Sequence, residues 1–194
     1  MSRKYRFGDQ DHLHFVTFTT INWIDVFIRE VYRQVMIDSV KYCQKNKGLE
    51  VYGYCLMTSH FHMIMGRNST STQEGLIRDM KRHTSKCMHT ILERVDIVHE
   101  SRREWLLWMM KRAGTRNTNN KGFQFWQQHN HPIEIWSPSV FDQKLNYMHM
   151  NPVEAGFVEQ PDSSISVIAE IQGCSFVSKS SINFSARGVN CRCR

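Results

Sequence analysis

The chain has 194 residues, of which 41% are hydrophobic and 22% charged, as in one soluble globular domain with an elaborated end. No window approaches eighteen consecutive apolar residues, and the basic N-terminus lacks the apolar run of a signal peptide, so we expect no membrane segment. The six cysteines form no CxxC pair, which argues against a zinc cage or disulfide framework and predicts reduced thiols in the cytoplasm.

Positive charge is concentrated in one part of the chain. The formal net charge is +7, and residues 78–121 contain eleven Lys or Arg against five Asp or Glu. Such a concentration indicates a polyanionic partner, with nucleic acid as the leading candidate. A solvated helix face that happens to be basic would produce the same count, so charge alone leaves both interpretations open.

The first third of the chain shows patterns of strand, helix, strand and strand. Residues 12–20 alternate and are rich in β-branched and aromatic side chains, which predicts a strand. Apolar residues at helical spacing over 28–47 predict a helix that ends at Gly48. Residues 50–56 and 60–65 are predicted as a second and a third strand, joined by a short turn.

The basic region is predicted to form two helices. Residues 71–74 resemble a helix cap, and the helix after them would bury one apolar stripe. That stripe comprises Ile77, Met80, Thr84, Cys87 or Met88, Ile91 and Val95. A second basic helix is predicted over 101–112. Its buried side would contain Trp105, Leu106, Trp108 and Met109, because aromatic residues at helical spacing more often pack than stack on bases.

Connecting segments and a short strand follow the basic helices. Residues 114–122 form a polar, basic loop, which suits a surface connection or a nucleic-acid contact. Residues 123–128 are predicted as a fourth strand, and 133–136 form a short apolar piece.

A last helix is predicted from about residue 140 to 150, with Ser137 or Ser139 as its cap. Pro152 should end it near Asn151, because proline disfavours helical geometry at the preceding residue. Tyr147 and Asn151 are four residues apart and therefore share one helix face.

Two histidines bracket Phe61 at the start of the third predicted strand. Side chains alternate along a strand, so His60 and His62 would point to one face and Phe61 to the other. Two imidazoles side by side on a rigid strand can bind one metal ion. The alternative is a pair of ordinary strand histidines bonded to backbone or water.

The order of these elements and motifs resembles the REP-associated tyrosine transposases, which belong to the HUH single-strand endonuclease superfamily. The segments that carry the resemblance are MTSHFHMI at 57–64 and YMHMNPVEAG at 147–156. RREWLL at 102–107 and FQFWQQHNHPIE at 123–134 also look like this family. The resemblance spans roughly residues 5 to 158.

The resemblance implies an α+β, ferredoxin-like or RRM-like fold, with a central antiparallel sheet and helices packed on one face. The His-x-His strand would be central, and the helix with Tyr147 would lie across it. A transposase domain would cover residues 1–158, with a basic helical insertion at about 97–122. Residues 159–194 depart from the family pattern, and we expect them to form an atypical, loosely ordered tail.

The resemblance also implies a reaction, namely cleavage and rejoining of single-stranded DNA near hairpin, or palindromic, elements. Tyr147 would be the nucleophile and would form a 5′-phosphotyrosine, while His60, His62 and Asn151 would bind Mg²⁺ or Mn²⁺. The partner would be single-stranded or hairpin DNA, bound by a monomer or a homodimer. The DNA phosphates would contact Arg78, Lys81, Arg82, Lys86, Arg102, Arg103, Lys111 and Arg112.

The departure after Glu159 motivates a second hypothesis. A non-cleaving, nucleic-acid-binding regulator could keep the transposase fold and bind hairpins in a salt-sensitive manner without nicking them. A replication initiator or relaxase is a weaker alternative because its usual additional domains do not fit within 194 residues.

Overall fold

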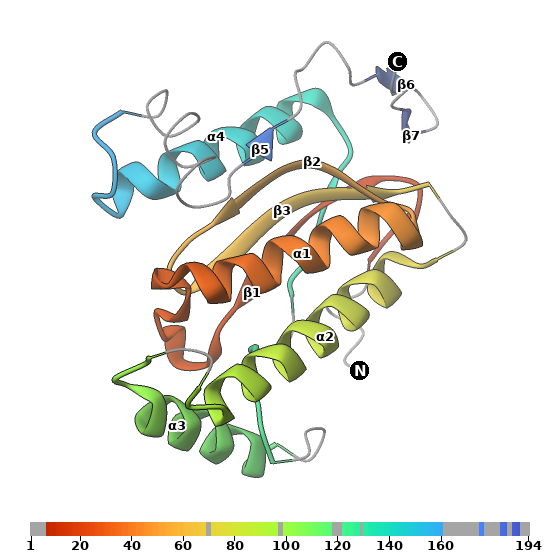
Figure 1. The fold of residues 1–194 in the computed structure, drawn as a ribbon. Helices are drawn as coiled ribbons and strands as arrows, with labels where there is room; N and C mark the ends of the chain where they lie inside the picture. The colour runs from red at the N-terminus through yellow and green to blue at the C-terminus, as the bar shows by residue number, and fades with distance from the viewer. Residues whose placement is uncertain are drawn as a thin grey trace.

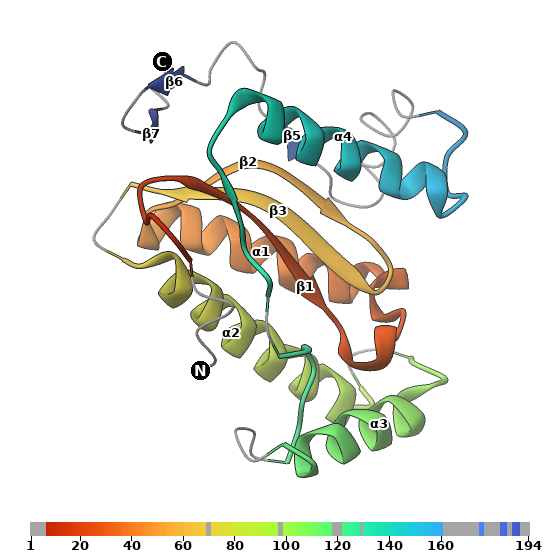
Figure 2. The ribbon, with the colours of Figure 1, turned by 180° about the vertical axis from the view of Figure 1, so that it is seen from behind.

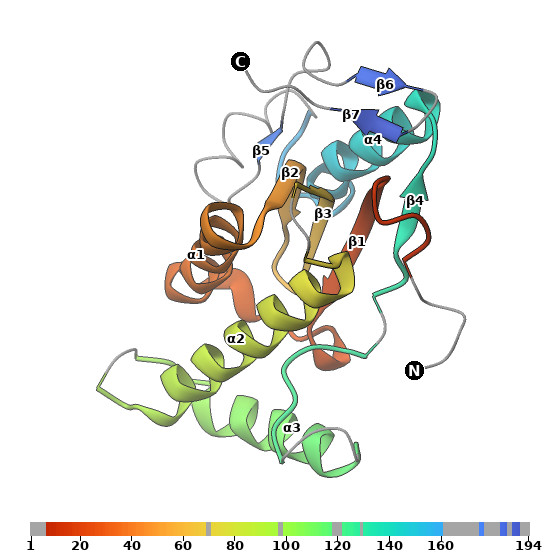
Figure 3. The same cartoon turned by 90° about the vertical axis from the view of Figure 1, so that its right-hand side faces the viewer.

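The computed structural model describes residues 7–68, 71–96, 99–117, 122–128 and 130–160, and the backbone of three short strands after residue 174. In the described part, a sheet lies between two layers of helices (Figures 1 and 3).

An antiparallel sheet forms the centre, with the strand order β4-β1-β3-β2-β5. Its strands are β1 (Leu13–Thr19), β2 (Leu49–Leu56), β3 (His60–Arg67), β4 (Ile133–Ile135) and β5 (Ser175–Phe176). The strands predicted at 12–20, 50–56 and 60–65 are therefore confirmed. β3 pairs with β1 on one side and β2 on the other, so the His-x-His strand is central as expected (Figure 2).

In the described residues, four helices and two 3-10 turns accompany the sheet. They are η2 (Ile21–Trp23), η3 (Val26–Ile28), α1 (Glu30–Lys47), α2 (Gln73–Glu93), α3 (Arg103–Thr115) and α4 (Pro138–Glu154). The start and stop signals act as predicted. Gly48 ends α1 with a φ of 68°, a conformation that glycine adopts without steric cost. Thr72 and Ser137 cap α2 and α4 through their side-chain oxygens. β6 (Asn183–Ser185) pairs with β7 (Gly188–Asn190) in an antiparallel ladder.

Each face of the sheet has its own apolar core, because side chains alternate along the strands. Val16, Phe61 and Met63 pack toward α1, α2 and α3, whereas Phe15 and Ile64 pack toward α4. The chain order β1-α1-β2-β3-α2-β4 is that of the ferredoxin-like fold, with α3 between α2 and β4. The expected α+β fold class is confirmed, with α1 and α2 on one face and α4 across the other (Figure 3).

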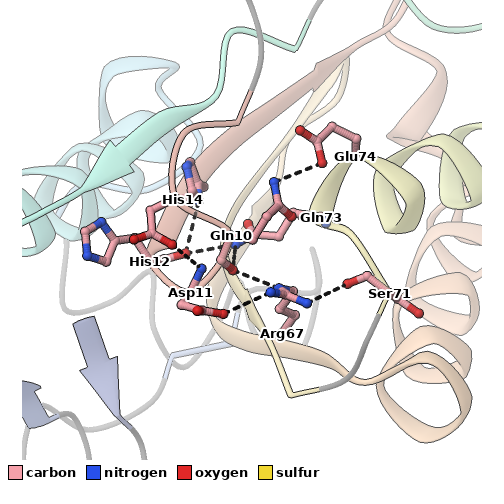
Figure 4. A network of polar contacts seen from close by, with 9 residues as sticks. Gln10, Asp11, His12, His14, Arg67, Ser71, Gln73 and Glu74 are labelled. Carbon is pink, nitrogen blue, oxygen red and sulfur yellow. Dashed lines mark hydrogen bonds and ion pairs between the residues drawn. The ribbon is translucent and has the colours of Figure 1, made fainter. Parts of the chain in front are cut away.

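A buried glutamine connects the start of α2 to the segment before β1. Gln73 is fully buried, and its Nε2 donates to the carbonyls of Gln10 at 2.9 Å and His12 at 2.8 Å. The Gln10 side chain in turn accepts from the Gln73 backbone N–H, and Arg67 on β3 donates to the Gln10 carbonyl (Figure 4). These bonds pair backbone groups of the segment before β1 and hold α2 against the sheet.

The prediction for the buried side of α3 was correct for Leu106 and wrong for the two tryptophans. Trp105 and Trp108 are 46% and 53% exposed, and the buried residues are Leu106, Met110 and Gly114. This stripe repeats every four residues and faces the end of α2 and the returning chain. Gly114 permits that close approach, because a Cβ there would lie 2.4 Å from the backbone nitrogen of residue 123.

Two further predictions require correction. Residues 123–128 form no strand, and Trp126 makes a single bridge to Thr20, because the chain after β1 turns away into η2 and offers no longer edge. α4 continues through Pro152 to Glu154, since Pro152 lies in the last turn and Ala155 still bonds to the Asn151 carbonyl. Within the predicted loop at 114–122, residues 118–121 lie outside the described part of the chain.

The predicted stripe of α2 is largely correct, with one exception. Ile77, Met80, Thr84 and Met88 are buried. Val95 is 76% exposed because the helix ends at Glu93, and Leu92 fills the last buried position instead.

Candidate functional site

The two histidines of β3 project from the face of the sheet that α4 covers. Their neighbour Phe61 is buried on the opposite face, as the alternation predicted. The ring centroids of His60 and His62 lie 4.7 Å apart. His62 is 3% exposed, whereas His60 is only half-buried and lies closer to the surface.

α4 brings Tyr147 and Asn151 to these histidines. The Tyr147 ring lies 5.2 Å from the ring of His62 and 5.9 Å from that of Phe15, between centroids. Tyr147 is 45% exposed, so its phenol is accessible to a partner in solution. The Asn151 amide donates to the Tyr147 carbonyl at 2.9 Å, and its side chain also hydrogen-bonds His60. The structure therefore brings together residues from two segments that are far apart in the sequence.

A threonine on the neighbouring strand orients His62. Thr17 lies opposite His62 in the β1–β3 register, and its Oγ1 is 2.8 Å from His62 Nδ1. When Nδ1–H donates to this hydroxyl, the lone pair of the neutral ring is on Nε2. Nε2 is buried and has no hydrogen-bond partner among the described residues. Ser59 Oγ lies 3.2 Å from His60 Nδ1 and is suited to the same role for the second imidazole.

Both imidazoles are neutral at neutral pH. Burial, and to a smaller degree the adjacent His60, lower the pKa of His62 to about 3. Burial also lowers the pKa of His60, although the hydrogen bond from its ring N–H to the Asn151 side chain opposes that shift. A neutral imidazole has a lone pair for a metal ion, so burial keeps these residues in the form that can act as a ligand.

The donor set at this position is two imidazoles and one amide. No group of three or more His, Cys, Asp or Glu that could hold a metal occurs in the described part of the chain. The buried, unpartnered Nε2 of His62 nevertheless fits a divalent ion, which would satisfy its lone pair. Neutral ligands would leave the full charge of such an ion available to an anionic substrate.

Comparison with known proteins finds similarity to solved structures and none at the level of sequence families. No protein-family model and no curated protein matches the sequence. Among solved structures, the chain is similar to a REP-associated tyrosine transposase bound to a REP hairpin, with 15% identity and a TM-score of 0.59. The similarity covers 84% of this chain and 79% of that one. The chain therefore shares the fold of that structure.

A second similar structure is a Deinococcus radiodurans protein described as a candidate transposase. Its TM-score is 0.45 with 13% identity, over 76% of this chain and 95% of that chain.

The basic residues of the transposase-like fold divide into two groups, of which the first is exposed. Arg78, Arg82 and Lys86 lie on the solvent side of α2, and Lys111 and Arg112 on that of α3. The Arg112 guanidinium lies 5.0 Å from the ring centroid of Trp108, which holds it in a cation–π contact.

The second group is engaged within the fold. Arg103 donates to the carbonyls of three residues at the end of α2, at 2.8 to 3.2 Å, and so caps that helix. Arg102 pairs with Asp25 at 2.7 Å. Lys81 donates to the Gln127 carbonyl at 2.9 Å, and burial lowers the pKa of its ammonium to about 8.

Sequence patterns did not reveal three residues beside the site. To identify Thr17, one must know which residues pair between β1 and β3, and no local sequence pattern gives that register. Trp23 contacts His60 with ring centroids 5.4 Å apart and comes from η2, a segment without a predicted element. Lys144, whose Nζ lies 5.6 Å from the Phe15 ring centroid, could have been found, because it lies three residues before Tyr147 and shares its helix face.

Among the described residues, no helix combines the length and the apolar character that a membrane span requires.

Proposed function

We propose that the protein is a metal-dependent single-stranded DNA strand transferase that cleaves and rejoins DNA near hairpin elements. The observation that carries this proposal is the meeting of an accessible tyrosine on α4 with two neutral histidines on β3, at 5.2 Å between the Tyr147 and His62 rings. The similarity to a transposase bound to a REP hairpin supports the substrate class. The exposed basic residues of α2 and α3 are suited to the DNA phosphates.

His60 and His62 would hold Mg²⁺ or Mn²⁺ through ring nitrogens, with the Asn151 amide oxygen as the third ligand. When bound, the ion polarises the scissile phosphate and offsets the negative charge that develops during attack. Thr17 keeps the lone pair of His62 on Nε2, and the burial of His62 keeps that ring neutral.

Tyr147 would supply the nucleophilic oxygen. Its phenol loses a proton and attacks phosphorus in line, which forms a bond to the 5′-phosphate and breaks the bond to the 3′-oxygen of the preceding nucleotide. The leaving 3′-oxygen takes up a proton and becomes a 3′-hydroxyl. Attack by another 3′-hydroxyl reverses these steps, restores the phenol and joins the strands without ATP, because one phosphodiester is exchanged for another.

The test uses labelled hairpin DNA from sequences that flank the gene, incubated with the protein and Mn²⁺ and read on a denaturing gel. We expect a slow, protease-sensitive adduct that Tyr147→Phe abolishes while hairpin binding persists. Tyr42→Phe is the matched control, because Tyr42 is 58% exposed on α1, on the opposite side of the sheet. An adduct that survives Tyr147→Phe would overturn the assignment. Binding without any adduct would favour the non-cleaving regulator.

A further inference from the structure

A polar cleft lies beside the histidine–tyrosine site and is not used by the proposed reaction. It has a volume of about 680 Å³ and lies between η2, the C-terminal end of α3 and the segment 124–128. Its lining includes Asn22, Trp23, Arg116 and Gln128. A volume of this order is in the range of small-molecule pockets and is large enough for a nucleotide.

Trp23 belongs to both the cleft and the site. Its ring contacts His60, with centroids 5.4 Å apart, and it also lines the cleft. It is 60% exposed, which is unusual for a tryptophan beside a core. Asn22 and Trp23 both have positive φ angles, 51° and 56°, and this conformation is an outlier for a bulky side chain. Such backbone conformations persist where surrounding contacts impose them, and they cluster at ligand clamps.

Hydrogen bonds hold the walls of the cleft in place. Thr20 Oγ1 donates to the carbonyls of Ile24 and Ser59, which fixes the loop that carries Trp23 to the turn before His60. The opposite wall is held by Gln127, whose backbone N–H and side-chain Nε2 donate to the carbonyls at the end of β1. The cleft is therefore formed before any ligand binds, and its position relative to His60 is set.

The chemistry of the lining suits a nucleobase with its phosphate. An exposed indole offers a face for stacking, which is the usual contact to unpaired bases. Side-chain amides of Asn22 and Gln128 can hydrogen-bond to base edges. Arg116 is exposed, and its guanidinium makes no hydrogen bond or ion pair with the described residues, so it is available to a phosphate. None of the described residues that line the cleft is acidic.

We propose that this cleft binds an unpaired nucleobase of the DNA strand that passes His60, with the base stacked on Trp23. This inference rests on the proposed function and adds to it a specific contact to the single-stranded part of the substrate. The base next to the reacting phosphate is then recognised by the protein itself, and the stacked base positions the strand along β3.

The experiment measures the affinity of a DNA hairpin with a short single-stranded extension, using Tyr147→Phe protein so that no covalent step contributes. Abasic sites are placed at successive positions of the extension, on either side of the hairpin. We expect one or two adjacent abasic positions to weaken binding by at least about fivefold, the loss of one stacking contact. Adding Trp23→Ala should remove this discrimination. Adding Trp136→Ala should not, because Trp136, 72% exposed, does not line the cleft.

A second variant keeps the test decisive if Trp23→Ala disturbs folding. Gln128 is exposed, so Gln128→Glu adds a negative charge to the cleft without a cost in the core. It should weaken binding of the extended hairpin and leave binding of the bare hairpin unchanged. Equal effects on both DNAs, or no effect on either, would overturn the inference, as would retained abasic discrimination in folded Trp23→Ala protein.

The two proposals can fail separately. Abasic discrimination that depends on Trp23, without a covalent adduct in the wild-type protein, would refute the strand-transfer reaction and keep the base-binding cleft. An adduct that forms without any such discrimination would refute the cleft and keep the reaction.

Discussion

Thr17→Val tests the idea that a hydroxyl on β1 sets the tautomer of His62. Valine keeps the branched shape and removes the oxygen that lies 2.8 Å from His62 Nδ1. Because His62 is 3% exposed, water cannot replace the lost partner without rearrangement. The ring is then free to move its proton to Nε2, the nitrogen that we assign to the metal.

The size of the effect follows from burial. An unsatisfied buried N–H costs about 1–3 kcal/mol, and each kcal/mol shifts Tm by roughly 2–4 °C in a domain of 150–250 residues. Loss of the partner that orients a metal-bound histidine typically weakens metal binding by about 10–100-fold. We therefore expect both a lower Tm without metal and a weaker affinity for Mn²⁺.

Calorimetric titration with Mn²⁺ measures the affinity, and thermal unfolding in the presence of a chelator measures the stability of the metal-free protein. Thr90→Val is the matched control, because Thr90 is an exposed threonine on α2. An unchanged Mn²⁺ affinity in Thr17→Val would refute the orienting role of the hydroxyl, whatever the change in Tm.

Three other predictions address the fold and the basic surface. Gln73→Ala should lower the free energy of unfolding, measured in urea, by about 1–3 kcal/mol, since a fully buried side chain and its hydrogen bonds to two backbone carbonyls are lost, whereas exposed Gln34→Ala should change it by less than about 0.5 kcal/mol. Burial lowers the pKa of Lys81 to about 8 from 10.5, so the unfolded chain binds more protons between these values. The free energy of unfolding of the wild type, relative to that of Lys81→Met, should therefore rise from pH 8 to 10.5. If the difference between the two proteins did not change with pH, the burial of the Lys81 ammonium would be contradicted. Arg82→Ala should reduce the slope of DNA affinity against salt concentration by the equivalent of about one phosphate contact, with Tm unchanged. Arg103→Ala should instead lower Tm, because it removes the cap of α2.

The segments with strong local signals were predicted correctly from the sequence. The strands around residues 15 and 62 alternate with period two, and α1 combines helical spacing with a glycine stop, so neighbouring residues determine each element. Local signals failed where a distant contact decides the outcome. Trp105 and Trp108 are large apolar residues, but the buried stripe of α3 runs through Leu106 and Met110 and leaves both tryptophans exposed.

The candidate site likewise has features that local sequence patterns predict and features that only long-range packing decides. Alternation on β3 and four-residue spacing on α4 determine, from the sequence alone, that His60 shares a face with His62 and Tyr147 with Asn151. Which of these faces meet is decided by the packing of α4 across the sheet, which depends on apolar contacts between segments far apart in the chain. The hydrogen-bond partner of His62 depends on the β1–β3 register. The cleft beside Trp23 is formed by three segments that lie together only in the folded chain. Local patterns therefore determine which side chains can act together, and long-range packing decides which of them do.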